Sequence, residues 1–130
     1  MSRNLTHFDL FAIIKQGILS KKVKVRILNR RFFISILNIL YKNGYIRFFY
    51  VSKDYKYIYI FLKYSYGQSM IQNIRLFSSP SKPVCLSFKK LLFLRRQVNS
   101  FGIVSTDAGL KTIDSCIFLK KGGRLICLIE

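Results

Sequence analysis

Apolar residues near the start of the chain recur with the spacing of an α-helix. Four of them share one helical face: Leu10, Phe11, Ile14 and Ile18. This spacing predicts a first helix over residues 5–16. Thr6 with Asp9 three residues later resembles a capping box, and Gly17 is suited to end the helix in the left-handed conformation.

A basic strand and a second helix are predicted next. Residues 21–27 alternate basic and apolar side chains, which indicates a strand with one wet, positive face and one buried face. The second helix has Asn29 as its N-cap and Asn43-Gly44 at its end. Its apolar stripe has helical spacing: Phe33, Ile36, Leu37, Leu40 and Tyr41.

The periodicity then becomes that of two strands. Residues 45–52 and 55–63 flank the turn Lys53-Asp54 and predict an antiparallel hairpin. The second strand places its aromatic side chains on one face: Tyr55, Tyr57, Tyr59 and Phe61. These rings suit either packing beneath the helices or stacking of unpaired bases. We favour packing, because the helices need a surface to cover.

The one cluster of proline and serine, SSPSKP at residues 78–83, predicts a linker between two domains. The domains then cover residues 1–77 and 84–130. The second is expected to begin with a strand at residues 84–88 and a short helix at 89–99. A strand that runs into a turn at 101–109, a further segment at 111–119 and a closing strand at 124–129 follow. The fold class is α+β, with a helix-strand-helix-hairpin domain followed by a mixed sheet with one short helix.

Composition adds a large positive charge to this picture. The chain has 23 Lys and Arg against five Asp and Glu, a formal charge of +18, yet 51% of it is hydrophobic and able to build a core. A polyanion is the natural partner of such a surface. The single histidine and the thinly spread acids argue against an enzyme, a metal site or a cofactor. We expect His7 to be a surface residue at the start of a helix.

Neither a membrane span nor a targeting segment is apparent. The longest uncharged stretch is residues 64–74, eleven residues, whereas a span needs about 18 apolar ones. The first residues lack the apolar core of a signal peptide and the pattern of a transit peptide. Cys85, Cys116 and Cys127 form no CxxC pair, and we expect all three to be reduced and buried.

Residue types with AT-rich codons dominate the composition. Ile, Phe, Lys, Tyr, Asn and Met make up 59 residues, and Gly, Ala, Arg and Pro make up 20. This bias is typical of an AT-rich genome such as an organelle's, and we expect a mitochondrial protein made in the compartment where it works. A chloroplast and an AT-rich bacterium are alternatives that composition does not separate.

Four motifs, in order, resemble the small-subunit ribosomal protein S8 family. LNRRFFISILNILYKNGYIRFF at residues 28–49 resembles its second helix and the GYI exit, and LKYSYGQSMIQNIRLFSSP at residues 62–80 resembles its LKY…G…I…I…S-x-P segment. IVSTDAGL at residues 103–110 resembles its STSKG loop, and GGRLICLIE at residues 122–130 resembles its ending. Together these motifs cover most of the chain.

The resemblance implies two closely packed α+β domains and direct, early binding to the central domain of the small-subunit ribosomal RNA, beside neighbouring small-subunit proteins. In the family the Ser-Thr loop lies against a distorted RNA helix, which carries over to Ser105, Thr106 and Gly109. Gly122-Gly123 matches the family's turn before the last strand. Asp107-Ala108 stands where the family has Ser-Lys, so the loop lysine is missing and a carboxylate appears.

Two groups of basic residues are candidate phosphate contacts, because Lys and Arg neutralise phosphates. The first group is Lys21, Lys22, Lys24, Arg26, Arg30 and Arg31. The second group is Arg95, Arg96, Lys120 and Lys121. Each also suits a solvated face, but such a face would normally carry balancing acids.

We therefore predict a non-enzymatic, RNA-binding structural protein of the small subunit of the mitochondrial ribosome, on the matrix side, that supports assembly and translation. The alternative is a basic peripheral membrane-surface protein. That alternative needs an amphipathic helix with Lys along its polar face, whereas the predicted second helix carries its Lys and Arg at the ends. A nuclease or RNA-modifying enzyme needs converging acids or a His–Lys pair, for which the sequence has few candidates.

Overall fold

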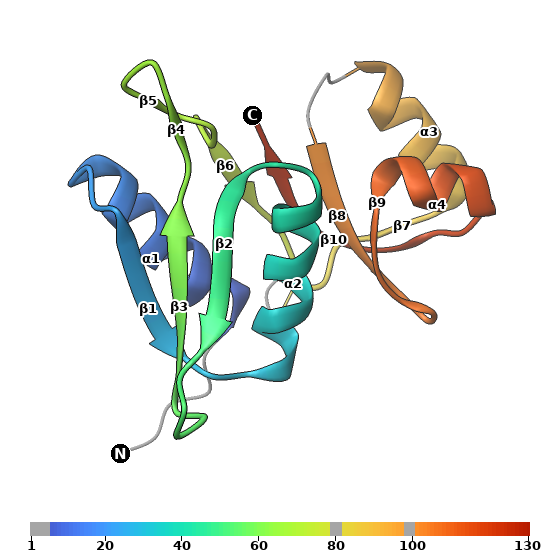
Figure 1. Cartoon of the computed structure of the whole chain (residues 1–130). Coiled ribbons are helices and arrows are strands. Elements are labelled where there is room, and N and C mark those ends of the chain that lie inside the picture. Colours follow the sequence, from blue (N-terminus) through green and yellow to red (C-terminus); the bar gives the residue numbers. More distant parts are fainter. Residues whose placement is uncertain (1–5, 79–81, 98–100) are drawn as a thin grey trace. The chain divides into compact units, whose positions relative to one another are not determined.

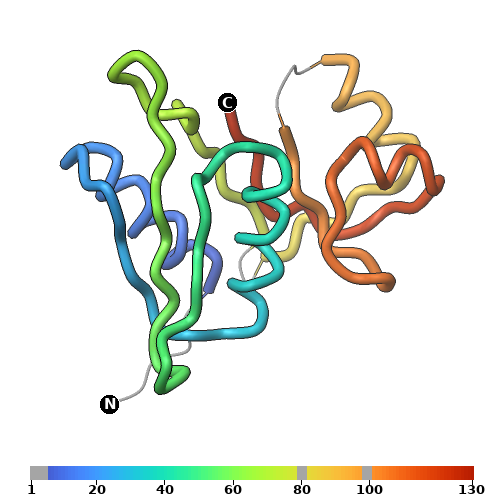
Figure 2. Tube along the Cα trace, in the orientation of Figure 1, coloured from blue at the N-terminus to red at the C-terminus, as the bar shows by residue number. Residues whose placement is uncertain are grey.

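The computed structural model describes residues 6–78, 82–97 and 101–130 and divides the chain into two compact units. The N-terminal unit is Met1–Gln72 and the C-terminal unit is Asn73–Glu130 (Figures 1 and 2). Both units combine helices with antiparallel strands, so the predicted α+β class is confirmed.

The division between the units falls before the Pro/Ser segment that the sequence indicated as a linker. β6 (Ile74–Leu76) pairs with β10 (Gly123–Ile129), and Asn73 exchanges backbone hydrogen bonds with Glu130. This strand pairing joins residues before the Pro/Ser segment to the C-terminal sheet. Residues 79–81, within the predicted linker, lie outside the described residues.

A three-stranded antiparallel sheet of order β1-β3-β2 forms the base of the N-terminal unit. Its strands are β1 (Lys24–Leu28), β2 (Ile46–Val51) and β3 (Tyr57–Leu62). The helices α1 (His7–Leu19) and α2 (Arg31–Lys42) pack on it, and a small hairpin of β4 (Tyr64–Ser65) and β5 (Gln68–Ser69) follows (Figure 1). The predicted hairpin is thus present, and its second strand also pairs with β1.

The two helices of this unit cover the aliphatic face of the sheet. Ile58 and Ile60 of β3 are fully buried, as are the main apolar residues of the helices: Leu10, Phe11, Ile14, Phe33, Ile36, Leu37 and Leu40. Tyr41, expected in the same stripe, is instead 50% exposed and lies at its edge. The apolar spacing therefore located the core-facing side of both helices.

The capping box of α1 is confirmed, but its predicted end is wrong. Thr6 Oγ1 accepts a hydrogen bond from the Phe8 amide, and Asp9 Oδ2 accepts one from the Thr6 amide at 2.8 Å. Gly17 lies inside the helix, where an added Cβ would sit 2.5 Å from Val25 Cγ1. Gly17 therefore permits close packing on β1, and the left-handed residue is Lys21, with φ +53°.

Two residues near helix starts also differ from their predictions. His7 is only 4% exposed, because it opens α1 on the inner side and its ring contacts those of Phe8 and Phe32. Asn29 is not the N-cap of α2, a position that Arg30 holds without a side-chain bond. Asn29 Nδ2 instead donates to the Tyr55 carbonyl at 3.0 Å, which ties the end of β1 to the hairpin turn.

The C-terminal unit is organised around β10, which pairs with β6, β7 (Cys85–Leu86) and β8 (Phe101–Thr106). β9 (Gly109–Thr112) extends the sheet beyond β8, and the helices are α3 (Phe88–Gln97) and α4 (Ile113–Leu119). The core cluster of this unit comprises Leu91, Val104, Ile113, Cys116, Leu125 and Leu128.

The prediction of one short helix in this unit is wrong, because α4 is a second one. The prediction of a mixed sheet is also wrong, since all strand pairs of this sheet within the described residues are antiparallel. Thr112 caps α4: its Oγ1 accepts a hydrogen bond from the Ser115 amide at 3.1 Å. The predicted end of the first helix, at residues 98–99, lies outside the described residues.

All three cysteines are free thiols, and two of them are buried as expected. Cys116 belongs to the core cluster, and burial raises the pKa of Cys127 to about 12. The prediction is wrong for Cys85, which is exposed. In the short strand β7 Cys85 points outward, whereas Leu86 packs against the core.

Candidate nucleic-acid interface

The predicted Ser-Thr loop is the tight turn that joins β8 to β9. Ser105 pairs with Leu110 and Thr106 with Gly109 across the two strands. Thr106 Oγ1 donates to the Gly109 carbonyl at 2.7 Å and accepts from the Ala108 amide at 3.2 Å. Gly109 has φ +103°, a conformation that glycine adopts without a Cβ penalty, and it completes the turn.

These bonds determine what the turn offers to a partner. A threonine hydroxyl has one proton and two acceptor lone pairs. Thr106 uses its proton and one lone pair within the turn, which leaves one acceptor for a donor such as the 2′-hydroxyl of RNA. Ser105 lies half-buried beside it, while residues 107–109 are exposed. Small polar groups on an exposed backbone suit the wide, shallow minor groove of RNA.

The Gly122-Gly123 turn lies beside the Ser-Thr turn because the two backbones approach closely. A Cβ on Gly123 would be 2.5 Å from the Ser105 carbonyl oxygen, and one on Gly122 would be 2.5 Å from the Leu86 carbonyl oxygen. The close approach accounts for both glycines, and Gly123 positions the strand that carries Ser105. An RNA contact of the glycines themselves stays a prediction.

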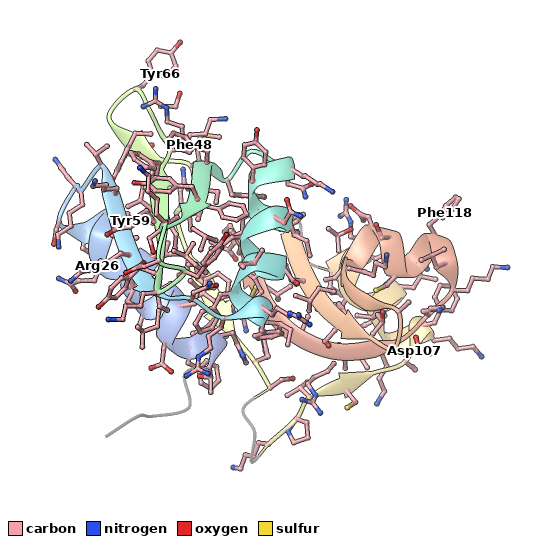
Figure 3. The ribbon with its side chains drawn as sticks, turned by 60° about the horizontal axis from the view of Figure 1, so that its bottom comes forward. Arg26, Phe48, Tyr59, Tyr66, Asp107 and Phe118 are labelled. Carbon is pink, nitrogen blue, oxygen red and sulfur yellow. The ribbon has the colours of Figure 1, made fainter. Side chains whose placement is uncertain are left out.

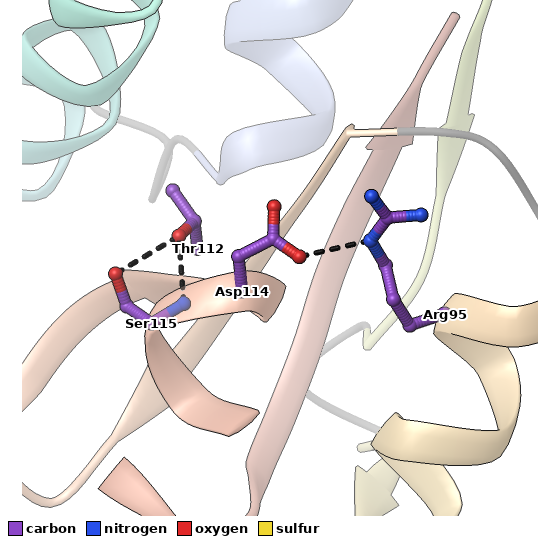
Figure 4. Close-up of polar contacts among 4 residues, drawn as sticks. All are labelled: Arg95, Thr112, Asp114 and Ser115. Carbon is purple, nitrogen blue, oxygen red and sulfur yellow. Dashed lines mark hydrogen bonds and ion pairs between the residues drawn. The ribbon is translucent and has the colours of Figure 1, made fainter. Parts of the chain in front are cut away.

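Carboxylates partly neutralise the second basic group. Lys121 Nζ lies 3.5 Å from Asp107 Oδ1 on the turn. Figure 4 shows the second pair, in which Arg95 Nε donates to Asp114 Oδ1 at 2.8 Å. Arg96 and Lys120, the other members of the group, are exposed. Such exposed ion pairs are screened by water and contribute little, so a phosphate can displace them. Lys121 also brings a cation to a turn that has no lysine of its own.

The first basic group lies along β1, which is an edge strand of the N-terminal sheet. Two of its six residues precede this strand, two lie on it and two follow it: Lys21, Lys22, Lys24, Arg26, Arg30 and Arg31. All six are exposed. The structure therefore spreads this group along one edge of the sheet.

The aromatic side of β3 is open, so its predicted packing beneath the helices is wrong. The helices cover the opposite face, while the rings on this side are partly or largely exposed. We call this surface the aromatic face and define it by Phe48, Tyr50, Tyr57, Tyr59 and Phe61; Figure 3 shows Phe48 and Tyr59 over the sheet with Arg26 nearby. Tyr55 lies outside it, in the turn before β3, with φ +60° and 77% exposure.

Sequence reasoning identified this row of rings but favoured packing over base stacking, because period-two alternation separates two faces without stating which one meets the helices. A usable signal was present in β1 and β3 together. The alternating aliphatic residues of both strands fill the core: Val25, Ile27, Ile58, Ile60 and Leu62. The rings with a hydroxyl group and the alternating Lys24 and Arg26 reach water.

Within the described ranges 6–78, 82–97 and 101–130, no group of three or more His, Cys, Asp or Glu side chains is placed to hold a metal ion. Among the helices of the same part of the chain, none is long and apolar enough to cross a membrane. The candidate sites of the described chain are surfaces made of hydroxyl groups, cations and aromatic rings.

The strongly positive net charge of both units suits assembly with a polyanion. Residues 7–129 match the family described as Ribosomal protein S8, and the chain belongs to this family. The predicted family is thus confirmed.

One curated relative is "Small ribosomal subunit protein uS8m" of Schizosaccharomyces pombe. It is 35% identical over 79 residues, which are 53% of this chain and 52% of the relative. The matched part of the chain thus spans about half the length of this relative.

Proposed function

We propose that this protein is a structural constituent of the small subunit of the mitochondrial ribosome, on the matrix side, and that it binds the central domain of the small-subunit ribosomal RNA directly. In this role it supports subunit assembly and translation beside neighbouring small-subunit proteins. Membership of the S8 family supports the ribosomal role, and the name of the fission-yeast relative supports the subunit and the organelle. The AT-rich composition agrees with an organelle.

One observation carries the proposal: the C-terminal unit brings hydroxyl, backbone and cationic groups together from distant parts of the sequence. The Ser-Thr turn, the Gly122-Gly123 turn and Lys121 meet at the same end of β8 and β10. The hydroxyl groups and exposed backbone suit 2′-hydroxyls and base edges, and the cations suit the neighbouring phosphates. Such a site selects an RNA shape, which charge alone does not.

The test compares two RNAs with one double substitution, Ser105→Ala with Thr106→Ala. We expect binding to a central-domain RNA fragment to weaken by about tenfold or more, because contacts to charged or polar RNA groups are lost. Binding to an unrelated RNA of equal length changes less than about twofold, since phosphate contacts dominate there. Ser65→Ala, an exposed serine of the N-terminal unit, is the control.

Equal losses on both RNAs would remove the turn from the specific site. Binding to anionic vesicles that competes with RNA, with no preference for the central-domain fragment, would instead favour the membrane-surface alternative. Thermal unfolding of each variant separates these outcomes from a loss of fold.

A further inference from the structure

Four of the five rings of the aromatic face lie in two rows of side chains that run across the sheet. Strand register aligns Lys24, Phe61 and Phe48 in one row, and Arg26, Tyr59 and Tyr50 in the other. The rings within each row are stacked. Phe48 and Phe61 have centroids 4.3 Å apart and planes at 14°, and Tyr50 and Tyr59 have centroids 5.2 Å apart and planes at 22°.

Cations from β1 cover one side of the central rings. Lys24 Nζ lies 5.4 Å from the Tyr59 centroid and 5.9 Å from that of Phe61, and Arg26 Cζ lies 4.5 Å from the Tyr57 centroid. β2 stands on the other side of β3, so Tyr59 lies between a cation and a second ring. These contacts hold the rings in fixed positions and place positive charge beside them.

The stacks end at β2, which is the other edge of the sheet. Phe48 and Tyr50 are the last ring of each row and remain 40% and 44% exposed. No further strand pairs with β2 within the described residues, so a planar group can continue either stack.

We propose that the aromatic face binds unpaired nucleotides of RNA, with bases stacked on Phe48 and Tyr50 and phosphates near Lys24 and Arg26. Base–aromatic stacking beside a positive groove is the usual means of binding single strands. No acid belongs to either row, and the N-terminal unit carries 13 Lys and Arg against two acids. This charge favours a polyanion over another basic ribosomal protein. The inference rests on the proposed ribosomal function but uses a separate surface.

The test measures binding of the full chain to a seven-nucleotide single-stranded RNA and to a blunt RNA duplex. We expect Phe48→Ala with Tyr50→Ala to weaken single-strand binding by about tenfold or more, because each stacked base loses its platform. Binding to the duplex changes less than about twofold, since paired bases are not available to stack. Tyr50→Phe keeps the ring and retains single-strand binding. Tyr41→Ala, which removes an exposed ring from α2, is the matched control.

A second measurement uses the unaltered chain. Light-induced crosslinking of a 4-thiouridine strand is expected to label Phe48 or Tyr50, and labels confined to the C-terminal unit would overturn the proposal. Unchanged single-strand binding by the folded Phe48→Ala, Tyr50→Ala variant would also overturn the proposal. So would a result in which this variant binds RNA normally but no longer binds another ribosomal protein. The proposed function is tested with a different RNA, the central-domain fragment, and with different substitutions, at Ser105 and Thr106. Failure of the proposed function can therefore be distinguished from failure of this inference.

Discussion

The two units present different kinds of surface to a nucleic acid. In the C-terminal unit the candidate site is a turn whose hydroxyl and backbone groups are held by internal hydrogen bonds and close backbone contacts. In the N-terminal unit it is a flat sheet face on which rings and cations stand side by side. A fixed turn is suited to recognise one RNA shape, whereas a stacking platform accepts any unpaired base.

Charge sharpens this contrast. The N-terminal unit carries a formal charge of +11, from 13 Lys and Arg and two acids, and the C-terminal unit carries +7, from 10 and three. Two of the three acids in the C-terminal unit, Asp107 and Asp114, form ion pairs with members of the second basic group. The carboxylates of the C-terminal unit therefore offset part of its positive charge, whereas no acid belongs to the two rows of the aromatic face.

The largest effect is expected for Gly123→Ala. Its new Cβ would lie 2.5 Å from the Ser105 carbonyl oxygen, a backbone atom that cannot swing away, so the C-terminal sheet must shift. We expect the free energy of unfolding to fall by about 3 kcal/mol, measured by urea denaturation, with loss of central-domain RNA binding.

Gly67→Ala is the control, because that glycine has open space around it and only a positive φ of +79°. Gly67→Ala should lower the free energy of unfolding by only about 1 kcal/mol, and this variant should still bind single strands through the aromatic face. Native stability of Gly123→Ala would show that the close approach does not constrain the turn.

The sequence predicted the buried faces of the helices correctly, but it did not predict the role of Gly17 or the open face of the N-terminal sheet. Apolar spacing located the buried side of both N-terminal helices, because period 3.6 marks the face that leaves water. The same logic failed for Gly17, since a glycine can serve a close helix–strand contact as well as a helix end. The partners of a strand, and hence which face is open, depend on long-range pairing that local spacing does not encode.

The candidate site also has one part that the sequence predicted and one part that it did not. The Ser-Thr turn was predicted from a short motif, because a tight turn needs its glycine and small polar residues within a few positions. Its meeting with Lys121 was not, because that contact joins residues 14 apart through the pairing of β8 with β10. The stacked rows of rings depend on register between three strands, which only the structure supplies.

A smaller effect separates the two hydroxyl groups of the turn. Thr106→Val removes both bonds within the turn, so we expect a loss of about 1 to 2 kcal/mol in the free energy of unfolding along with weaker RNA binding. Ser105→Ala should weaken central-domain binding without a measurable change in stability. Thr106→Ser is the conservative variant, and it should retain both the stability and the RNA binding of the unaltered protein. A stability loss in Ser105→Ala equal to that of Thr106→Val would mean that both hydroxyl groups hold the turn.

The salt dependence of single-strand binding tests the cations of the aromatic face. For single strands the slope of log K against log salt changes by about 0.7 for each phosphate contact. Lys24→Gln with Arg26→Gln should therefore lower the slope by about 1.4, measured between 50 and 300 mM salt by fluorescence anisotropy, roughly the window in which such slopes are resolved. Lys42→Gln, at the end of α2, is the matched control. An unchanged slope would place the phosphates elsewhere.

The smallest effect concerns the carboxylate of the turn. Asp107→Asn releases Lys121 from its ion pair and removes a negative charge from the candidate site, so central-domain binding should strengthen by about two- to threefold at low salt. The gain should fade at high salt, and thermal stability should not change, because the pair is exposed. Asp54→Asn, on the hairpin turn of the other unit, should leave central-domain binding unaltered. If Asp107→Asn weakens binding instead, the carboxylate accepts a hydrogen bond from the RNA and replaces the lysine that this turn lacks.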